Sequence, residues 1–167
     1  MSELTGDWNR ISNILNPSKL KAKLRQSAAR IGNYGASQVK KGIINGNFIP
    51  LHPATIARKH SSKPLVDHGD LVGSITYQVL DDNNSVFIGV KKGKEVNIAA
   101  VHEFGCTIGV TPKMRAYLHH IGIHLKSSTR YIHIPARPYL RPVLQSQEFL
   151  NEVKNIYMRA LKEAFEL

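Results

Sequence analysis

Two short runs rich in β-branched and aromatic residues, 74–80 and 86–90, flank the four residues Asp81-Asp82-Asn83-Asn84. Consecutive Asp and Asn side chains favour a chain reversal, and both runs have the length of a strand. The pattern therefore predicts an antiparallel β-hairpin near the middle of the chain.

Helical periodicity dominates on both sides of this hairpin. Apolar residues spaced by three and four predict a long helix from Pro17 to about Asn45. A kink near Gly32 and Gly35 is consistent with the sequence, because each glycine lowers helix stability by about 1 kcal/mol relative to alanine. A final helix is predicted over 139–167. Shorter elements are expected as helices at 4–15, 53–59, 96–104 and 112–125, as one helical turn capped by Asp70, and as a strand at 131–134.

These elements predict an α+β fold with a small, mainly antiparallel sheet of about three or four strands, packed by long N- and C-terminal helices. We expect a single domain over 1–167, with an N-terminal helical arm at about 1–46 and a C-terminal helix at about 139–167. Hydrophobic residues make up 42% of the chain, enough for a core. No apolar run is long enough to cross a bilayer, so no membrane partner is expected. The single cysteine, Cys106, excludes an internal disulfide.

Positive charge is concentrated in the first third of the chain. Residues 1–63 hold 11 Lys and Arg and only two acidic residues, and no acidic side chain occurs from Trp8 to Val66. Phosphate or an acidic protein surface would complement such a region, although a solvated helix face is an equal alternative. The candidate basic face consists of Lys19, Lys21, Lys23, Arg25, Arg30, Lys40, Lys41, Arg58 and Lys59.

The residues that suggest metal or catalytic chemistry form incomplete patterns. His102-Glu103 begins like a zinc-protease helix, but Cys106 stands where the second histidine is needed. His120 and His124 would share one face of the predicted helix 112–125, but two imidazoles supply only about half of the ligands that a zinc site needs. Asp67-His68-Gly69-Asp70 is better explained by a turn and a helix cap than by a metal. We therefore predict no catalytic residue, no metal and no cofactor.

Three further segments occur in a distinctive order. They are Pro64-Leu65-Val66-Asp67-His68-Gly69-Asp70-Leu71-Val72-Gly73-Ser74-Ile75, Ala99-Ala100-Val101-His102-Glu103-Phe104-Gly105 and Ile134-Pro135-Ala136-Arg137-Pro138-Tyr139-Leu140. In order and spacing the chain resembles phage virion-morphogenesis and tail-completion proteins. It departs from that family at His68, where threonine is usual, and at Tyr139, where phenylalanine is common.

The resemblance implies a structural virion protein, made in the host cytoplasm, that lies in the neck or at the head-proximal end of a phage tail. There it would complete the tail and join it to the head as a subunit of a homo-oligomeric ring, a hexamer or dodecamer. Its neighbours would be neck, connector and tail-tube proteins, with nonspecific contact to packaged DNA. The alternative is a sequence-nonspecific nucleic-acid-binding protein that uses the basic N-terminal third. A hydrolase is the least favoured alternative, and we expect no enzyme.

The same segments supply the candidate structural and assembly residues. Asp67, Gly69 and Asp70 are expected to set the turn before the hairpin. His102 and Glu103 are expected to end a short helix that Gly105 closes. Pro135 and Pro138 are expected to fix a bend that seats Tyr139 in the core and presents Arg137. For Arg137 we expect a buried or intersubunit ion pair, with Glu103 as a candidate partner; the alternative is an exposed surface residue.

Overall fold

The computed structural model describes residues 16–80, 85–91, 93 and 95–165. Its elements, in chain order, are α2 (Pro17–Asn45), α3 (Pro53–Lys59), α4 (Asp70–Ser74), β1 (Ile75–Val79), β2 (Val86–Val90), α5 (Glu95–Phe104), β3 (Cys106–Gly109), α6 (Pro112–His120), β4 (Tyr131–Ile134), α7 (Arg141–Leu144) and α8 (Gln147–Phe165). The α+β class and the long terminal helices are confirmed. The helix expected at 4–15 and the turn at 81–84 lie outside the described residues.

Helix α2 begins where the Asn16 side chain accepts hydrogen bonds from the N–H groups of Ser18 and Lys19, at 3.0 and 3.3 Å. It continues without a break through Gly32 and Gly35. A Cβ on Gly32 would overlap the ring of Tyr77, and one on Gly35 would lie 2.5 Å from Ile88 Cδ1. These glycines therefore let the β1–β2 hairpin approach the helix closely, which offsets their low helix propensity.

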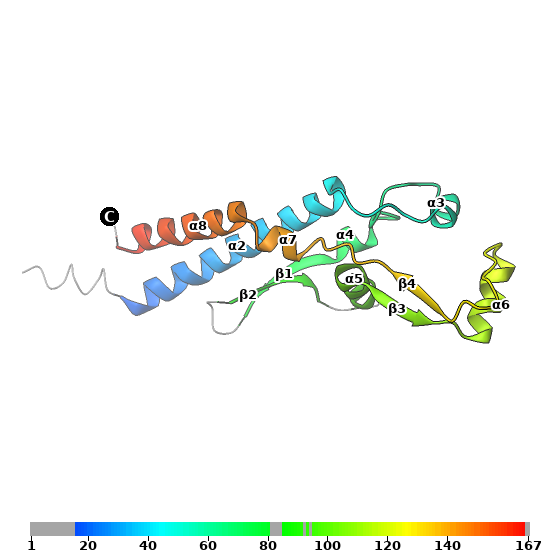
Figure 1. Ribbon diagram of the computed structural model, residues 1–167. Coiled ribbons are helices and arrows are strands. Elements are labelled where there is room, and N and C mark those ends of the chain that lie inside the picture. The colour runs from blue at the N-terminus through cyan, green and yellow to red at the C-terminus, as the bar shows by residue number, and fades with distance from the viewer. Residues whose placement is uncertain (1–15, 81–84, 92, 94, 166–167) are drawn as a thin grey trace, which may run out of the picture.

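Helix α8 lies alongside α2, and β1 and β2 pack against another side of α2 (Figure 1). The predicted hairpin is confirmed, with Ile75 paired to Val90 and Val79 paired to Val86. Val39 and Ile43 of α2 are almost fully buried together with Ile75. The main core therefore lies between α2 and β1, and Leu65, Leu71, Ala99 and Tyr139 complete it.

The C-terminal region is divided into two helices, whereas one continuous helix from Tyr139 was predicted. The first helix starts at Arg141, and the helical hydrogen bonding is interrupted after Leu144. The Ser146 hydroxyl donates to the Val143 carbonyl at 2.8 Å and accepts from the N–H of Phe149 at 3.2 Å. Ser146 thus closes α7 and caps α8, because a short hydroxyl side chain competes well for free backbone groups.

A second antiparallel hairpin extends away from the α2–α8 pair and carries α6 at its far end (Figure 1). In it Cys106 pairs with Ile134, and Gly109 pairs with Tyr131. Strand β4 was predicted, but β3 was not. The four described strands form two separate two-stranded sheets, whereas a single sheet of about three or four strands was predicted.

Candidate functional site

Residues 135–140, here called the strap, join β4 to α7 and cross the C-terminal end of α5. The buried Glu103 carboxylate accepts hydrogen bonds from the N–H groups of Tyr139 at 2.9 Å, Leu140 at 2.9 Å and Arg141 at 3.0 Å. Arg141 is the first residue of α7 and Leu140 its cap residue, whereas Tyr139 precedes the cap; the Leu140 side chain makes no capping bond. Glu103 therefore caps α7 from a different helix.

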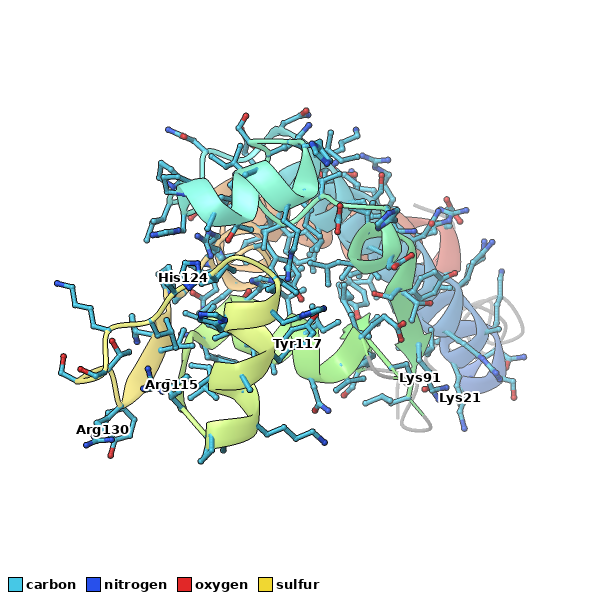
Figure 2. All side chains as sticks on the ribbon, turned by 90° about the vertical axis from the view of Figure 1, so that its right-hand side faces the viewer. Lys21, Lys91, Arg115, Tyr117, His124 and Arg130 are labelled. Atoms are coloured by element: carbon cyan, nitrogen blue, oxygen red, sulfur yellow. The ribbon has the colours of Figure 1, made fainter. Side chains whose placement is uncertain are left out.

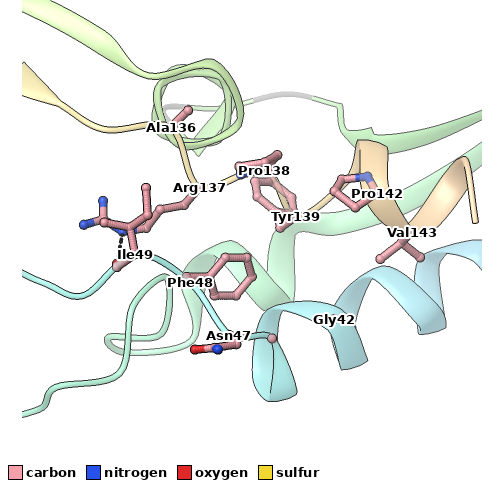
Figure 3. A pocket seen from close by; sticks show the side chains of 11 residues that line it. Gly42, Asn47, Phe48, Ile49, Ala136, Arg137, Pro138, Tyr139, Pro142 and Val143 are labelled. Atoms are coloured by element: carbon pink, nitrogen blue, oxygen red, sulfur yellow. Dashed lines mark hydrogen bonds between the residues drawn. The ribbon is translucent and has the colours of Figure 1, made fainter.

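Arg137 ties the strap to the segment that follows α2. Its guanidinium donates from Nε to the carbonyl of Ile49 at 2.8 Å (Figure 3). It also donates from NH2 to the carbonyl of Pro50 at 3.0 Å. Its main-chain N–H donates to the carbonyl of His102 at 2.7 Å. Arg137 is 5% exposed, which excludes the surface alternative. The intramolecular ion pair with Glu103 was wrong, because backbone groups satisfy both buried side chains.

Gly105 ends α5 and lies directly beneath the strap. Its φ is +76°, and its N–H donates to the carbonyl of Val101 at 2.8 Å, as expected for a residue that closes a helix. A Cβ at this position would lie 3.0 Å from the nitrogen of Ala136 and 3.1 Å from the oxygen of Ile134. Glycine is therefore required both by the backbone conformation and by the closeness of the strap.

Two titratable side chains lie in this junction. Burial lowers the pKa of His102, and the positive charges of Arg137 and Lys59 lower it further. The Nδ1 atom of His102 is buried, and no described residue gives it a hydrogen-bond partner. Tyr139 belongs to the core and is 4% exposed. Burial raises its pKa to about 12, and the Glu103 carboxylate contributes in the same direction.

A pocket of about 380 Å³ opens beside the strap (Figure 3). Its lining is mainly apolar and is formed by Gly42, Gly46, Asn47, Phe48, Ile49, Ala136, Arg137, Pro138, Tyr139, Pro142 and Val143. This lining contains no carboxylate, imidazole or thiol, and the Arg137 guanidinium is already bonded to two carbonyls. The pocket therefore brings together none of the carboxylate, imidazole or thiol groups most often used for acid–base or nucleophilic catalysis.

The turn before the hairpin differs in detail from the prediction. Gly69, with a φ of +91°, occupies the cap position of α4, and Asp70 is the first helical residue, without a side-chain capping bond. Asp70 as a cap was therefore wrong, because the turn requires a left-handed residue at the cap and glycine supplies it. Asp67 and His68 are exposed, with 3.5 Å between Oδ2 and Nδ1.

The three segments that carry the family resemblance meet in one core cluster. Leu71 comes from the first segment, Ala99 from the second and Tyr139 from the third, and all three pack with Val39 and Ile43 of α2. These segments are far apart in sequence, and what they share in the structure is that each contributes a side chain to the same core.

The nine candidate cations do not form a single face. Most lie along α2, whereas Arg58 and Lys59 lie on α3, near the opposite end of the molecule from the start of α2 (Figure 1). Lys23 Nζ lies 2.8 Å from Glu163 Oε2 of α8, so an acidic side chain from the far end of the sequence neutralises part of the positive charge of α2. Lys21, Arg25 and Arg30 are exposed.

The predicted histidine pair on one helix face was also wrong. Helix α6 ends at His120, and the left-handed Gly122, with a φ of +80°, turns the chain before His124. The imidazole of His124 instead packs edge to face against that of His119, with ring centroids 4.5 Å apart. Within residues 16–80, 85–91, 93 and 95–165, no three His, Cys, Asp or Glu side chains are grouped to hold a metal ion. None of the helices in these ranges is long and apolar enough to span a membrane.

Sequence reasoning missed the capping role of Glu103, although a signal was present. A carboxylate at the C-terminal end of a helix is opposed by the helix dipole, so it needs compensation from elsewhere. Here the compensation is the start of α7, where free N–H groups carry partial positive charge.

The model of the phage virion morphogenesis family matches residues 45–162. This range runs from the end of α2 into α8 and includes Glu103, Gly105 and Arg137. No curated protein and no solved structure matches the chain.

Proposed function

Because this chain belongs to the phage virion morphogenesis family, we propose that it is a ring-forming subunit of the neck or head-proximal tail end, where it completes the tail and joins it to the head. Membership itself establishes a bacteriophage virion protein with a role in particle assembly. The finer assignment, including a role without catalysis, is our proposal.

The exposed apolar side chains of α5 are the observation that carries this proposal. Only Ala99 and Glu103 of this helix are buried, yet its exposed side chains include Val96 at 36%, Ile98 at 48% and Phe104 at 65%. Exposed apolar side chains gathered on one element mark a surface that another protein covers. In an assembly protein, a neighbouring subunit is the partner that such a surface fits.

The shape of the subunit supports a ring. The α2–α8 pair lies at one end, and the hairpin that carries α6 extends at the other (Figure 1). An elongated subunit with two different ends has no internal symmetry, which favours a head-to-tail interface, here between the exposed surface of α5 and a neighbouring subunit. Such an interface closes into a ring when its rotation divides the circle. A hexamer or dodecamer is the expected product, flanked by neck, connector and tail-tube proteins.

The test is the mass of the purified protein in solution, measured by light scattering and native mass spectrometry. Wild type should form a closed oligomer, and the double variant Ile98→Ser with Phe104→Ser should dissociate it. The matched control is Leu150→Ser with Met158→Ser, which changes two similarly exposed apolar residues on α8 and should leave the oligomer intact. A wild-type protein that stays monomeric at high concentration would contradict the ring.

Placement in the particle needs a separate measurement. Mass spectrometry of purified virions should detect the protein, and phage that lack it should accumulate separate heads and tails. Complete, infectious particles without the protein would contradict a joining role.

A further inference from the structure

The β3–β4 hairpin with α6 and its loops, residues 106–134, here called the arm, contains no acidic residue. The whole stretch from 104 to 147 lacks Asp and Glu, whereas Lys113, Arg115, Lys126 and Arg130 lie within the arm. The arm extends away from the α2–α8 pair (Figure 1). A projecting element with charge of one sign creates a positive potential that its own residues do not cancel.

Arg115 fixes the loop at the tip of the arm. Its guanidinium donates to the carbonyls of Leu125 at 3.4 Å, Lys126 at 2.9 Å and Thr129 at 2.6 Å. Figure 2 shows Arg115 beside this loop and Arg130 at its outer edge. Three bonds from one guanidinium hold the backbone of residues 125–129, which carries Lys126 and leads into Arg130, so this backbone is ordered before any ligand arrives.

Three cations of the arm remain available, two of them beside this loop and one in the first turn of α6. Lys113, Lys126 and Arg130 are exposed, and no described residue pairs with their charged groups. Exposed hydroxyl and imidazole groups also occur in the arm. These are Ser127, Ser128, His119, His120, His124 and His133.

We propose that the arm binds the phosphate backbone of duplex DNA without reading its sequence. Lys, Arg and hydroxyl side chains are the groups that proteins use to contact phosphates. The arm is less suited to binding an acidic protein, because a stable protein interface needs an apolar centre. Tyr117 and Tyr131 are the two large apolar side chains of the arm that are strongly exposed in the described structure. A polar and cationic surface is typical of nonspecific DNA contacts.

This site is separate from the basic N-terminal third that the sequence pointed to. The arm proposal rests on the proposed function only for the source of the DNA, which lies inside the head that the tail joins. Its binding chemistry is a property of the purified chain and is measured without phage particles.

The test is fluorescence anisotropy with a labelled duplex of about 30 base pairs and arbitrary sequence, across a series of salt concentrations. The arm variant Lys113→Gln, Lys126→Gln and Arg130→Gln should bind at least about tenfold more weakly at low salt. The slope of log K against log salt should fall by about 2.7, because each lost phosphate contact removes about 0.9. A variant that binds like wild type, or that keeps the wild-type slope, overturns the proposal.

The matched control, Lys21→Gln, Arg25→Gln and Arg30→Gln, removes the same charge from α2. It should keep most of the affinity, and if it loses the binding instead, the N-terminal third is the DNA site and the proposal is wrong. A charge-preserving variant, Lys113→Arg, Lys126→Arg and Arg130→Lys, should bind within about twofold of wild type. Thermal unfolding of every variant checks that the fold is kept. We expect it to be kept, because no variant changes Arg115.

Competition separates the two classes of partner. Polyglutamate at equal charge concentration should displace the duplex poorly; if it binds the arm and DNA does not, the partner is an acidic protein and the proposal fails. This failure is distinct from failure of the proposed function. A monomeric chain that binds DNA through the arm contradicts the ring alone, and a ring whose arm variant binds normally contradicts the arm alone.

Discussion

The carboxylate of Glu103 accepts the main-chain N–H of Tyr139 at 2.9 Å across 36 positions of sequence. Glu103 lies in the last turn of α5, and Tyr139 lies in the strap and fills the core with Leu71 and Ala99. One buried side chain therefore joins two of the three segments that identify the family. The contacts of Glu103 and Arg137 in the described structure lie within one chain, so these two residues stabilise the fold.

Replacing Glu103 should destabilise the fold strongly. Glu103→Ala leaves the N–H groups of Tyr139, Leu140 and Arg141 without their acceptor, and we expect a loss of about 3 kcal/mol in the free energy of unfolding. Glu103→Gln keeps one acceptor oxygen and should lose less. Urea denaturation measures both. The control Glu148→Gln lies on the exposed first turn of α8 and should change stability by less than about 0.5 kcal/mol. Equal losses for Glu103→Ala and the control would show that the cap contributes nothing.

Replacing Arg137 tests the second tie of the strap. Arg137→Ala removes two charge-assisted hydrogen bonds to the carbonyls of Ile49 and Pro50, and it should cost about 3 kcal/mol. Arg137→Lys should recover only part of this free energy, because a single ammonium does not reproduce the two donors of the guanidinium. Arg130→Ala, which changes an exposed arginine, is the control for unfolding measurements. A neutral result for Arg137→Ala would mean that the 49–50 segment is held by other contacts.

Local sequence signals were sufficient for much of this fold and failed where distant residues decide. The β1–β2 hairpin and α2 follow from period and turn chemistry, and Gly105 follows from helix closure. Strand β3 was missed because Cys106–Gly109 is four residues long and becomes a strand only by pairing with β4. The partners of Arg137 were missed because they are carbonyls some 87 or 88 positions away, and a carbonyl has no sequence signature.

Gly105→Ala should destabilise through two effects that act together. Its left-handed backbone, with a φ of +76°, costs a residue with a Cβ about 1 to 2 kcal/mol, and the new methyl group would press on the backbone of the strap. We expect a total loss of about 2 kcal/mol or more in thermal or urea unfolding. Gly73→Ala is the matched control, because it lies in α4 and nothing stands within 4 Å of the position that its new methyl group would occupy. This control should be neutral or slightly stabilising, and a loss equal to that of Gly105→Ala would contradict the account.

Tyr139 should set an alkaline limit to stability. Its pKa is raised from 10.0 to about 12 in the folded protein, so the unfolded chain loses this proton first as pH rises. Stability from this group is complete below about pH 10 and is lost progressively as pH rises toward 12. Tyr139→Phe should therefore unfold less readily than wild type above about pH 10 and remain close to it at pH 7. Identical alkaline profiles for the two proteins would mean that the phenol does not titrate with unfolding.

His102 should make the protein less stable in mild acid. Its pKa lies below the ordinary 6.5, because burial and the nearby Arg137 and Lys59 oppose the charged imidazole. As pH falls below about 6.5, the unfolded chain takes up a proton at this position before the folded chain does. The free energy of unfolding should therefore fall from about pH 7 downward, until His102 is protonated in the folded state as well. Urea midpoints measured across this range should show a shallower decline for His102→Gln than for wild type. His133→Gln, which changes an exposed histidine of β4, should keep the wild-type profile; a profile flattened by His133→Gln and not by His102→Gln would assign the acid sensitivity to the arm.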